Sequence, residues 1–247
     1  TETISVENAE YDHVSGLTTI TTFKPNNFTK GMSVNISGLG FTCPPDTSTF
    51  VVGQSIANVE TTTGTRFTAG SGTTYDPATG LLVLDIGIGH GLTAQTDFTA
   101  TTGTTYNPTT GVLTVVTTAS HGMITGTYVK FAPDSLTFSC AKDGNATNHT
   151  YPRATDPIYN MWKQVTVVDA TTFQMDVGVS SDVSTHTFVS ATANGVKVAT
   201  DTVSIVDGSL IFTCAKDGNT TQHAYPRLTD PASGRVFGIE AISSTSI

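Results

Sequence analysis

Two segments of the sequence carry the same acidic, basic and imidazole side chains at the same spacing. In each segment a Lys-Asp pair is followed by His, then Arg, then a second Asp. Gathered in a pocket, such a set could perform general acid–base chemistry. The two sets are Lys142, Asp143, His149, Arg153 and Asp156, and Lys216, Asp217, His223, Arg227 and Asp230.

The surroundings of both sets favour a structural role over catalysis. The segments are rich in Gly, Asn and Pro, which is typical of surface loops, and one chain rarely carries two copies of one active site. We therefore expect each Arg to form a local ion pair with the following Asp and each Tyr to anchor its loop. A duplicated ligand-binding loop stays open as the alternative. The predicted loop anchors are Tyr151, Arg153 and Asp156, and Tyr225, Arg227 and Asp230.

No metal ion or cofactor is expected. Asp143-Gly144-Asn145 and Asp217-Gly218-Asn219 offer oxygen ligands, but the EF-hand pattern is absent, which leaves calcium as a weaker alternative. The cysteines are too far apart for a typical zinc site. No nucleophile elbow, phosphate-binding loop or zinc-protease motif occurs. The sequence predicts no catalytic residue, and a protein that is not an enzyme.

Each of the three cysteines ends a Leu-x-Phe-x-Cys pattern. Since side chains alternate along a strand, Leu, Phe and Cys share one face, which we expect to be buried. Each Cys is expected to be a free thiol in the core. A disulfide is the weaker alternative, because three cysteines cannot pair completely within one chain. The predicted core residues are Leu39, Phe41 and Cys43, Leu136, Phe138 and Cys140, and Leu210, Phe212 and Cys214.

Internal repeats organise most of the chain. Residues 135–157 and 209–231 are identical at 17 of 23 positions at an offset of 74, so we expect their backbones to superimpose. A second repeat, at an offset of 31, relates residues 72–82 to 103–113, with a fainter copy at 11–22. In this second repeat an Asp-Pro or Asn-Pro turn ends at Gly and is flanked by β-formers, which predicts a hairpin.

The composition indicates an all-β protein. Thr, which favours strands, makes up close to one residue in five, while good helix formers are scarce. Of all residues 37% are hydrophobic, which is enough to bury a core. The net charge of −9 argues against a nucleic-acid partner, and no apolar stretch approaches the ~20 residues of a membrane span.

We therefore expect an all-β fold of repeated small antiparallel β-sandwich or barrel modules with little helix. Predicted strands recur about every 8–12 residues, which is the spacing of such folds. Three modules are predicted: a partial repeat at 1–70, a central module with tandem hairpins at 71–198 and an incomplete module at 199–247.

The order of these motifs resembles a module of virion structural proteins from tailed phages, especially marine cyanophages. That module runs from the Y-[DN]-x-x-[ST]-G hairpin through a His-Gly step and L-x-F-x-C to Y-P-R-x-T-D-P. A Thr-Phe hairpin and an H-T-[FY]-V-S segment follow. Residues 106–198 match the whole order, 11–43 its first third and 207–247 its second half. Three departures stand out: Pro44-Pro45 replaces the first long loop, the hairpin at 72–92 runs straight into the next, and the last copy stops early.

The resemblance implies a non-enzymatic virion component, either a tail-fibre or baseplate-associated part or a capsid decoration protein. Its expected place is the extracellular particle, and its expected partners are other virion proteins and a host surface glycan or receptor. A homo-oligomer is expected, and a trimer by analogy. The alternative is a bacterial surface adhesin or filament subunit built from β-repeats. A carbohydrate-active enzyme is disfavoured, because carboxylates and aromatic residues are not clustered and Trp162 is the only Trp.

The last copy of the module suggests an unpaired strand. Residues 239–242 fall where residues 165–168 lie in the complete copy, but no counterpart of 173–177 follows them. A lone strand would expose unpaired backbone groups, and Phe237 and Ile239 would lack part of their cover. We expect either that the natural polypeptide continues past Ile247 or that a neighbouring subunit supplies the missing strand.

Overall fold

A computed structural model describes residues 6–12, 17–22, 26, 28–29, 32, 48–50 and 57–247. The chain divides into two compact units, Thr1–Pro45 and Asp46–Ile247. In the first unit, strands β1 (Val6–Asp12) and β2 (Leu17–Thr22) form an antiparallel hairpin. This is where the faint third copy of the hairpin repeat was predicted. Residues 39, 41 and 43, the first set of predicted core positions, lie outside the described residues.

The all-β prediction is confirmed. Every strand pair in the described residues is antiparallel, and these strands form several small sheets without a closed barrel. Helix is limited there to two single turns of 3₁₀ type, η1 (Ala141–Asp143) and η2 (Ala215–Asp217). No helix in the described part of the chain is long and apolar enough to cross a membrane.

One module lies entirely between residues 96 and 198 and is called the inserted module. Its sheets have the orders β13-β12-β17-β9-β10-β16-β15 and β14-β11-β18-β8. Its strands are β8 (Thr96–Phe98), β9 (Thr105–Asn107), β10 (Val112–Val116), β11 (Tyr128–Phe131), β12 (Leu136–Cys140), β13 (Asn148–Tyr151), β14 (Lys163–Gln164), β15 (Thr166–Val167), β16 (Thr172–Asp176), β17 (His186–Ala191) and β18 (Val196–Val198).

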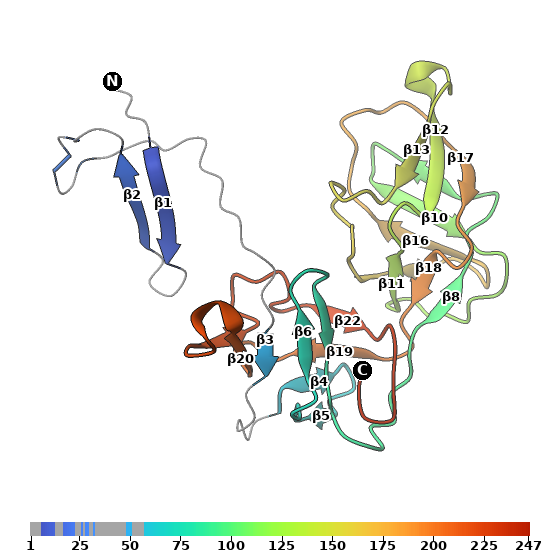
Figure 1. The fold of residues 1–247 in the computed structure, drawn as a ribbon. Helices are drawn as coiled ribbons and strands as arrows, with labels where there is room; N and C mark the ends of the chain where they lie inside the picture. The colour runs from blue at the N-terminus through green and yellow to red at the C-terminus, as the bar shows by residue number, and fades with distance from the viewer. Residues whose placement is uncertain are drawn as a thin grey trace. The chain divides into compact units, whose positions relative to one another are not determined.

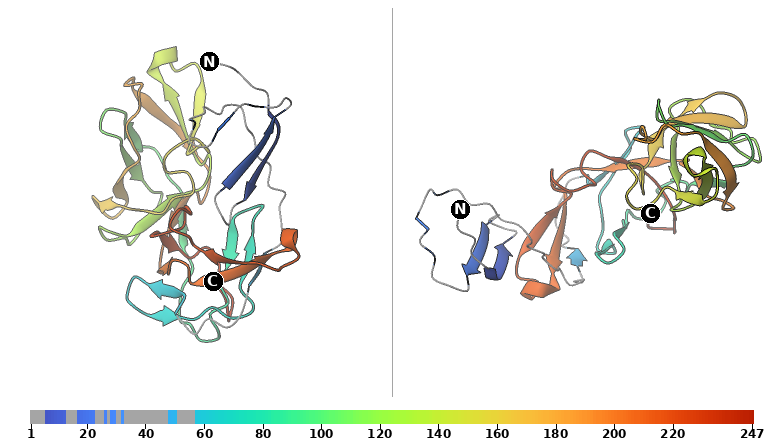
Figure 2. Two further views of the ribbon diagram at one scale, coloured as in Figure 1. Left: turned by 90° about the vertical axis from the view of Figure 1, so that its left-hand side faces the viewer. Right: turned by 90° about the horizontal axis from the view of Figure 1, so that it is seen from above.

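A second module is built from strands on both sides of the inserted module and is called the split module. Its sheets have the orders β21-β20-β3-β6-β7 and β22-β19-β4-β5. The ribbon views agree that its early and late strands lie together (Figure 1, Figure 2). Its strands are β3 (Ser48–Phe50), β4 (Val59–Thr61), β5 (Arg66–Phe67), β6 (Thr74–Asp76), β7 (Leu81–Val83), β19 (Thr202–Ile205), β20 (Leu210–Cys214), β21 (Gln222–Tyr225) and β22 (Val236–Gly238).

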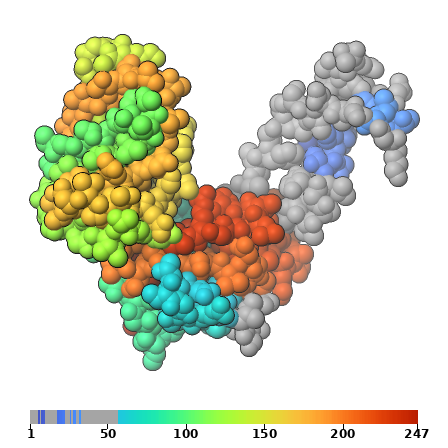
Figure 3. Space-filling view, turned by 180° about the vertical axis from the view of Figure 1, so that it is seen from behind, coloured from blue at the N-terminus to red at the C-terminus, as the bar shows by residue number. Residues whose placement is uncertain are grey.

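The two modules share one arrangement of strands in space, but the order of these strands along the chain is permuted. β3 and β4, which come first in the split module, correspond to β17 and β18, which come last in the inserted module. Both sheet orders of the split module match those of the inserted module strand for strand, except that β15 and β16 have no strand counterpart. The hairpin at 72–92, which lacks a continuation in sequence, is completed in space by strands from 202–238. Figure 3 shows the cyan segment near residue 60 against the orange and red segments beyond 200. Strand pairing thus connects residues of all three modules expected from the sequence.

The expectation of a lone, uncovered strand near residue 239 is wrong. β22 pairs with β19, and Ile239 is only 3% exposed within the core of the split module. Residues 245–247 run beside 84–86, where the backbone groups of Leu84 and Ile247 bond to each other at 2.9 and 3.0 Å. Ile247 therefore takes the place that Phe173 of β16 takes beside Val115 in the inserted module.

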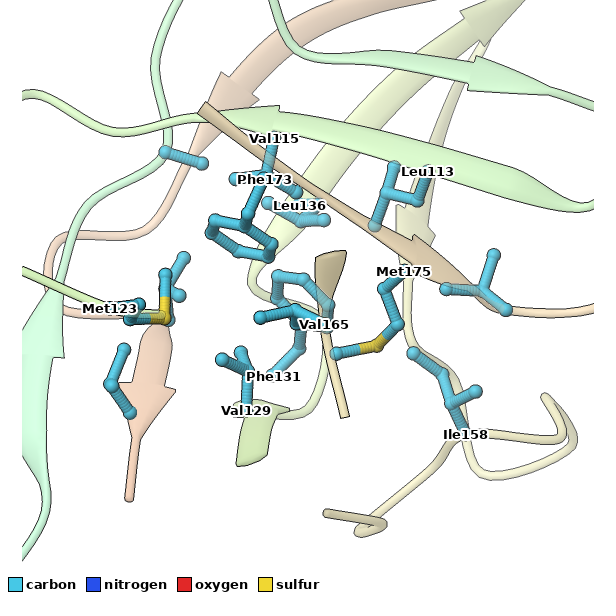
Figure 4. Packing of buried hydrophobic residues seen from close by; sticks show 14 of the residues in the cluster. Leu113, Val115, Met123, Val129, Phe131, Leu136, Ile158, Val165, Phe173 and Met175 are labelled. Carbon is cyan, nitrogen blue, oxygen red and sulfur yellow. The ribbon is translucent and has the colours of Figure 1, made fainter. Parts of the chain in front are cut away.

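Each module has its own hydrophobic core. In the inserted module, Leu113 and Val115 of β10 alternate with half-buried residues, as a strand with one buried face requires. They pack with Phe131, Leu136 and Phe173, all fully buried (Figure 4). The core of the split module contains Val59, Leu84, Ile86, Val203, Ile205, Leu210, Phe212 and Ile239.

A close contact joins the two modules. Trp162 of the inserted module covers Gly238 so tightly that a Cβ at this glycine would lie 2.6 Å from the indole ring. The ammonium group of Lys130 lies 5.3 Å from the centre of the same ring and forms an ion pair with Glu240. Only glycine fits beneath the indole, so this position makes a specific fit between the modules.

Candidate functional site

The inserted module contains a pocket of about 400 Å³ formed by its repeated loop. The floor is the inner face of the seven-stranded sheet, and the walls are segments 152–157 and 177–182. The lining residues are Tyr106, Leu113, Phe138, Cys140, Lys142, Asp143, His149, Thr150, Tyr151, Arg153, Asp156, Pro157, Val177, Gly178, Val179, Ser180, Asp182 and His186.

Strand register explains why aromatic side chains meet on the floor. Cross-strand partners point to the same face of a sheet, and His186 is paired with both Cys140 and Tyr106. Phe138 is likewise paired with His149. The rings of Tyr106 and His186 meet edge to face with centroids 5.5 Å apart. Tyr106 also donates a hydrogen bond of 2.8 Å to the carbonyl oxygen of Gly178, which fixes the 177–182 wall to the floor.

The loop that follows Cys140 is held by its own side chains. Gly144 adopts φ 69° and ends the η1 turn, a conformation that glycine allows at low cost. The Asp143 carboxylate accepts hydrogen bonds from the backbone N–H groups of Ala146 and Thr147 and from the Thr147 hydroxyl. The Thr147 hydroxyl is the main cause of the lowered pKa of Asp143. This carboxylate is therefore engaged in shaping the loop.

The remaining charged side chains around the pocket are paired. Arg153 binds Asp156 through two side-chain hydrogen bonds of 3.1 and 2.9 Å and a backbone bond of 2.7 Å. Lys142 lies 3.2 Å from Asp182. Hydrogen bonds from Ser184, the backbone N–H first, lower the pKa of Asp182 to about 2, with a smaller contribution from Lys142. The rim thus carries two ion pairs, Arg153 with Asp156 and Lys142 with Asp182.

Two buried polar atoms of pocket-lining residues have no hydrogen-bond partner among the described protein atoms. They are the hydroxyl oxygen of Tyr151 and Nδ1 of His186. Burial raises the pKa of Tyr151, and the Asp156 charge acts in the same direction. Such atoms are uncommon, since buried polar groups normally find a partner. Both atoms are enclosed by neighbouring atoms, so a bound molecule reaches them only if those side chains move.

The split module repeats the backbone conformation of the loop at its turns, as the predicted similarity of the two copies requires. Gly218 adopts φ 70° and Asn219 φ 61°, against 69° at Gly144 and 61° at Asn145. The peptide bonds that precede Pro152 and Pro226 are both cis. Arg227 and Asp230 repeat the double side-chain contact and the backbone hydrogen bond, and the Arg227 side chain is the main cause of the lowered pKa of Asp230.

The surroundings of the repeated loop differ between the modules. In the split module Tyr75 stacks on Tyr225 with ring centroids 5.7 Å apart. The counterpart of Tyr75 in the inserted module is Tyr106, and its ring contacts His186. By strand register Ser48 takes the place of His186. The wall 177–182 follows β16 in the inserted module, and residues 245–247 take the place of the start of β16 in the split module. The aromatic neighbours of the repeated loop therefore differ between the two modules.

The structure places the predicted core residues as follows. Leu136, Phe138, Cys140, Leu210 and Phe212 are buried, and Cys214 is partly buried. Neither Cys140 nor Cys214 forms a disulfide bond.

The predicted loop anchors Tyr151, Arg153 and Asp156 all line the pocket. Sequence reasoning missed Tyr106, His186 and Asp182 as parts of the same site, because they lie on other strands and loops. A usable signal was present: residues 187–189 repeat the Thr-Phe-Val of 49–51, but His186 replaces Ser48.

Within the described residues, no group of three or more His, Cys, Asp or Glu side chains is arranged to hold a metal ion. Comparison of the chain with protein-family models, with curated proteins and with solved structures finds no match.

Proposed function

We propose that this chain is a non-enzymatic structural component of a tailed-phage virion, either a tail-fibre or baseplate-associated part or a capsid decoration protein. The order of motifs from residue 106 to 198 suggests this class. The observation that supports it best is the architecture of residues 46–247, in which one β module is inserted into another with the same arrangement of strands in its sheets. The function is assembly of the particle and contact at its surface.

The interlocked architecture suits a protein exposed to harsh surroundings. Strand β4 pairs with β19, and β3 pairs with β20, so residues on either side of the inserted module hold the split module together. Pairings between residues so distant in sequence form slowly, because the long connection must be closed before the contacts form. Once formed, they join the two ends of the split module across the insertion.

The direct test is the location of the chain. Antibodies raised against residues 57–247 are applied to purified particles of the phage that encodes the chain, followed by gold labelling and electron microscopy. We expect labels at one repeated position on the particle, and peptides of the chain in the purified particles by mass spectrometry. Label on the bacterial envelope and none on particles would overturn the proposal in favour of a surface adhesin or filament subunit.

We also propose that the chain forms a homo-oligomer, and a trimer by analogy with fibre and decoration proteins. Light scattering after size-exclusion chromatography measures the mass directly. A single monomeric species at all concentrations would contradict this part of the proposal.

A further inference from the structure

We propose that the pocket of the inserted module binds a neutral saccharide unit. The proposal concerns a binding site only and does not depend on where the chain is located, so its failure would leave the virion proposal standing. A volume of about 400 Å³ is within the usual range for small-molecule sites.

The floor offers the apolar surface that a sugar ring requires. Tyr106, Phe138, His149, Tyr151 and His186 all line the pocket, and strand register brings most of them to one face of the sheet. Tyr and His side chains combine an apolar ring with a polar group, and Phe138 adds purely apolar surface. A pyranose has a matching character, because its C–H groups form apolar patches between its hydroxyl groups.

Two unpartnered polar atoms could bond ligand hydroxyl groups once the side chains that enclose them shift. The Tyr151 hydroxyl can donate or accept a hydrogen bond, and Nδ1 of His186 accepts or donates according to its tautomer. A site with buried polar groups that lack protein partners discriminates strongly in favour of a ligand that satisfies them. Ligand hydroxyl groups can serve both roles, since each is donor and acceptor.

The charges on the rim favour a neutral ligand over an ionic one. Arg153 is held by Asp156 and Lys142 by Asp182, while Asp143 is engaged by its own loop. Each cation thus has a carboxylate partner, and one further carboxylate remains. An anionic sugar would have to displace these carboxylates from the cations, whereas neutral hydroxyl groups can bond to the paired charges without separating them.

The split module supplies a matched internal control. Its loop has the same conformation, but Tyr225 stacks on Tyr75 and the position of His186 is occupied by Ser48. Tyr225→Phe therefore makes the same chemical change as Tyr151→Phe in a copy where the tyrosine ring stacks on another tyrosine. His186→Ser introduces the residue that the split module has at this position.

The experiment is saturation-transfer NMR on the full chain. The neutral probes are the methyl glycosides of glucose, galactose, mannose, rhamnose and N-acetylglucosamine. Methyl glucuronide and N-acetylneuraminic acid are the anionic comparators, and glycerol is the control for non-specific polyol contact. We expect transfer to at least one neutral glycoside, and dissociation constants from titration that Tyr151→Phe raises about 3- to 10-fold, the effect of one lost neutral hydrogen bond. His186→Ser should also weaken binding, and Tyr225→Phe should leave it unchanged.

The unliganded stability of the same variant guards against a folding artefact. Since the Tyr151 hydroxyl is buried without a protein partner, Tyr151→Phe should leave the melting temperature unchanged or raise it while it weakens binding. Three results would each overturn the proposal: no neutral glycoside gives transfer above glycerol, an anionic comparator binds more tightly than every neutral probe, or Tyr225→Phe weakens binding as much as Tyr151→Phe.

Discussion

Phe138 and Phe212 occupy the same position of the repeated Leu-x-Phe-x-Cys strand, one in each module. They are 5% and 6% exposed and pack in separate cores. Replacement by Ala removes a large apolar side chain and leaves a cavity, so each variant should lose about 3–5 kcal/mol of unfolding free energy. Urea or guanidinium titration measures this loss. Leu228→Ala is the control, because this side chain is 85% exposed and should change stability by less than about 0.5 kcal/mol.

The Arg227–Asp230 pair predicts a pH dependence of stability. Because the Arg227 side chain is the main cause of the lowered pKa of Asp230, Arg227→Gln should move that pKa back toward its ordinary value. Carbon-detected NMR of the side-chain carboxyl measures the shift. An unchanged Asp230 titration in the variant would show that the side-chain contact does not exist in solution.

The sign of the stability effect follows from linkage. A carboxyl group with a lowered pKa in the folded state contributes stability that is complete above its unfolded pKa of about 3.9. The contribution is lost as the pH falls through the lowered folded value. Arg227→Gln should therefore be less stable than the wild type at neutral pH, and the difference should shrink in acid. A deficit that stays constant from pH 7 to pH 2 would point to lost packing instead.

Sequence spacing could predict contacts within a loop but not across the pocket. Arg153 and Asp156 are three residues apart in a turn, so their pairing follows from local geometry alone. Tyr106 and His186 are brought together by the register of β9 and β17, which no local pattern encodes. The anchors of the loop were therefore predictable, and the composition of the pocket was not.

At the scale of elements, the equivalent hairpin turns at Gly80 and Gly111 provide a matched pair. Both residues adopt φ 73°, which costs an L-residue about 1–2 kcal/mol. A Cβ at Gly80 meets nothing within 4 Å, whereas one at Gly111 would lie 2.5 Å from the backbone carbon of Gly178. Gly111→Ala should therefore destabilise the chain by about 1–3 kcal/mol more than Gly80→Ala, as measured by chemical unfolding.

The same pair of variants tests the pocket wall. Gly111 accepts a hydrogen bond from the N–H of Val177, and Pro108 accepts one from Ser180, so this turn supports segment 177–182. Amide chemical-shift changes should extend into that segment in Gly111→Ala and remain near the turn in Gly80→Ala. Equal effects of the two variants on stability and on 177–182 would contradict the described packing.

The individual hairpins and core strands could be predicted, but their partners could not. Turn residues and alternating apolar residues are local signals, and they identify β6, β7, β9, β10, β12 and β20. Which strand lies beside which depends on packing between distant segments. The offset of 31 places two first halves of a module in tandem. That pattern indicates an insertion, because the strands that complete the first of these halves lie after residue 200 in the sequence.

At the scale of the whole chain, the insertion predicts that the inserted module can fold alone. Its first and last strands are neighbours, with Thr96 paired to Val198, so the chain enters and leaves at one place. Domains inserted in this way have adjacent ends and their own core, and all strands of this module pair within it. A fragment of residues 93–199 should show a strand-type circular dichroism spectrum and unfold cooperatively.

The position of the cut is what makes this prediction specific. A fragment of residues 71–198, the boundary expected from sequence, adds the β6–β7 hairpin without β3, and thus exposes an unpaired edge and the apolar faces of Tyr75 and Leu82. Exposed edges of this kind promote association, so the 71–198 fragment should aggregate at concentrations where 93–199 stays monomeric by light scattering. If 93–199 is unfolded, the contact of Trp162 with Gly238 is required for folding, and the two modules form one cooperative unit.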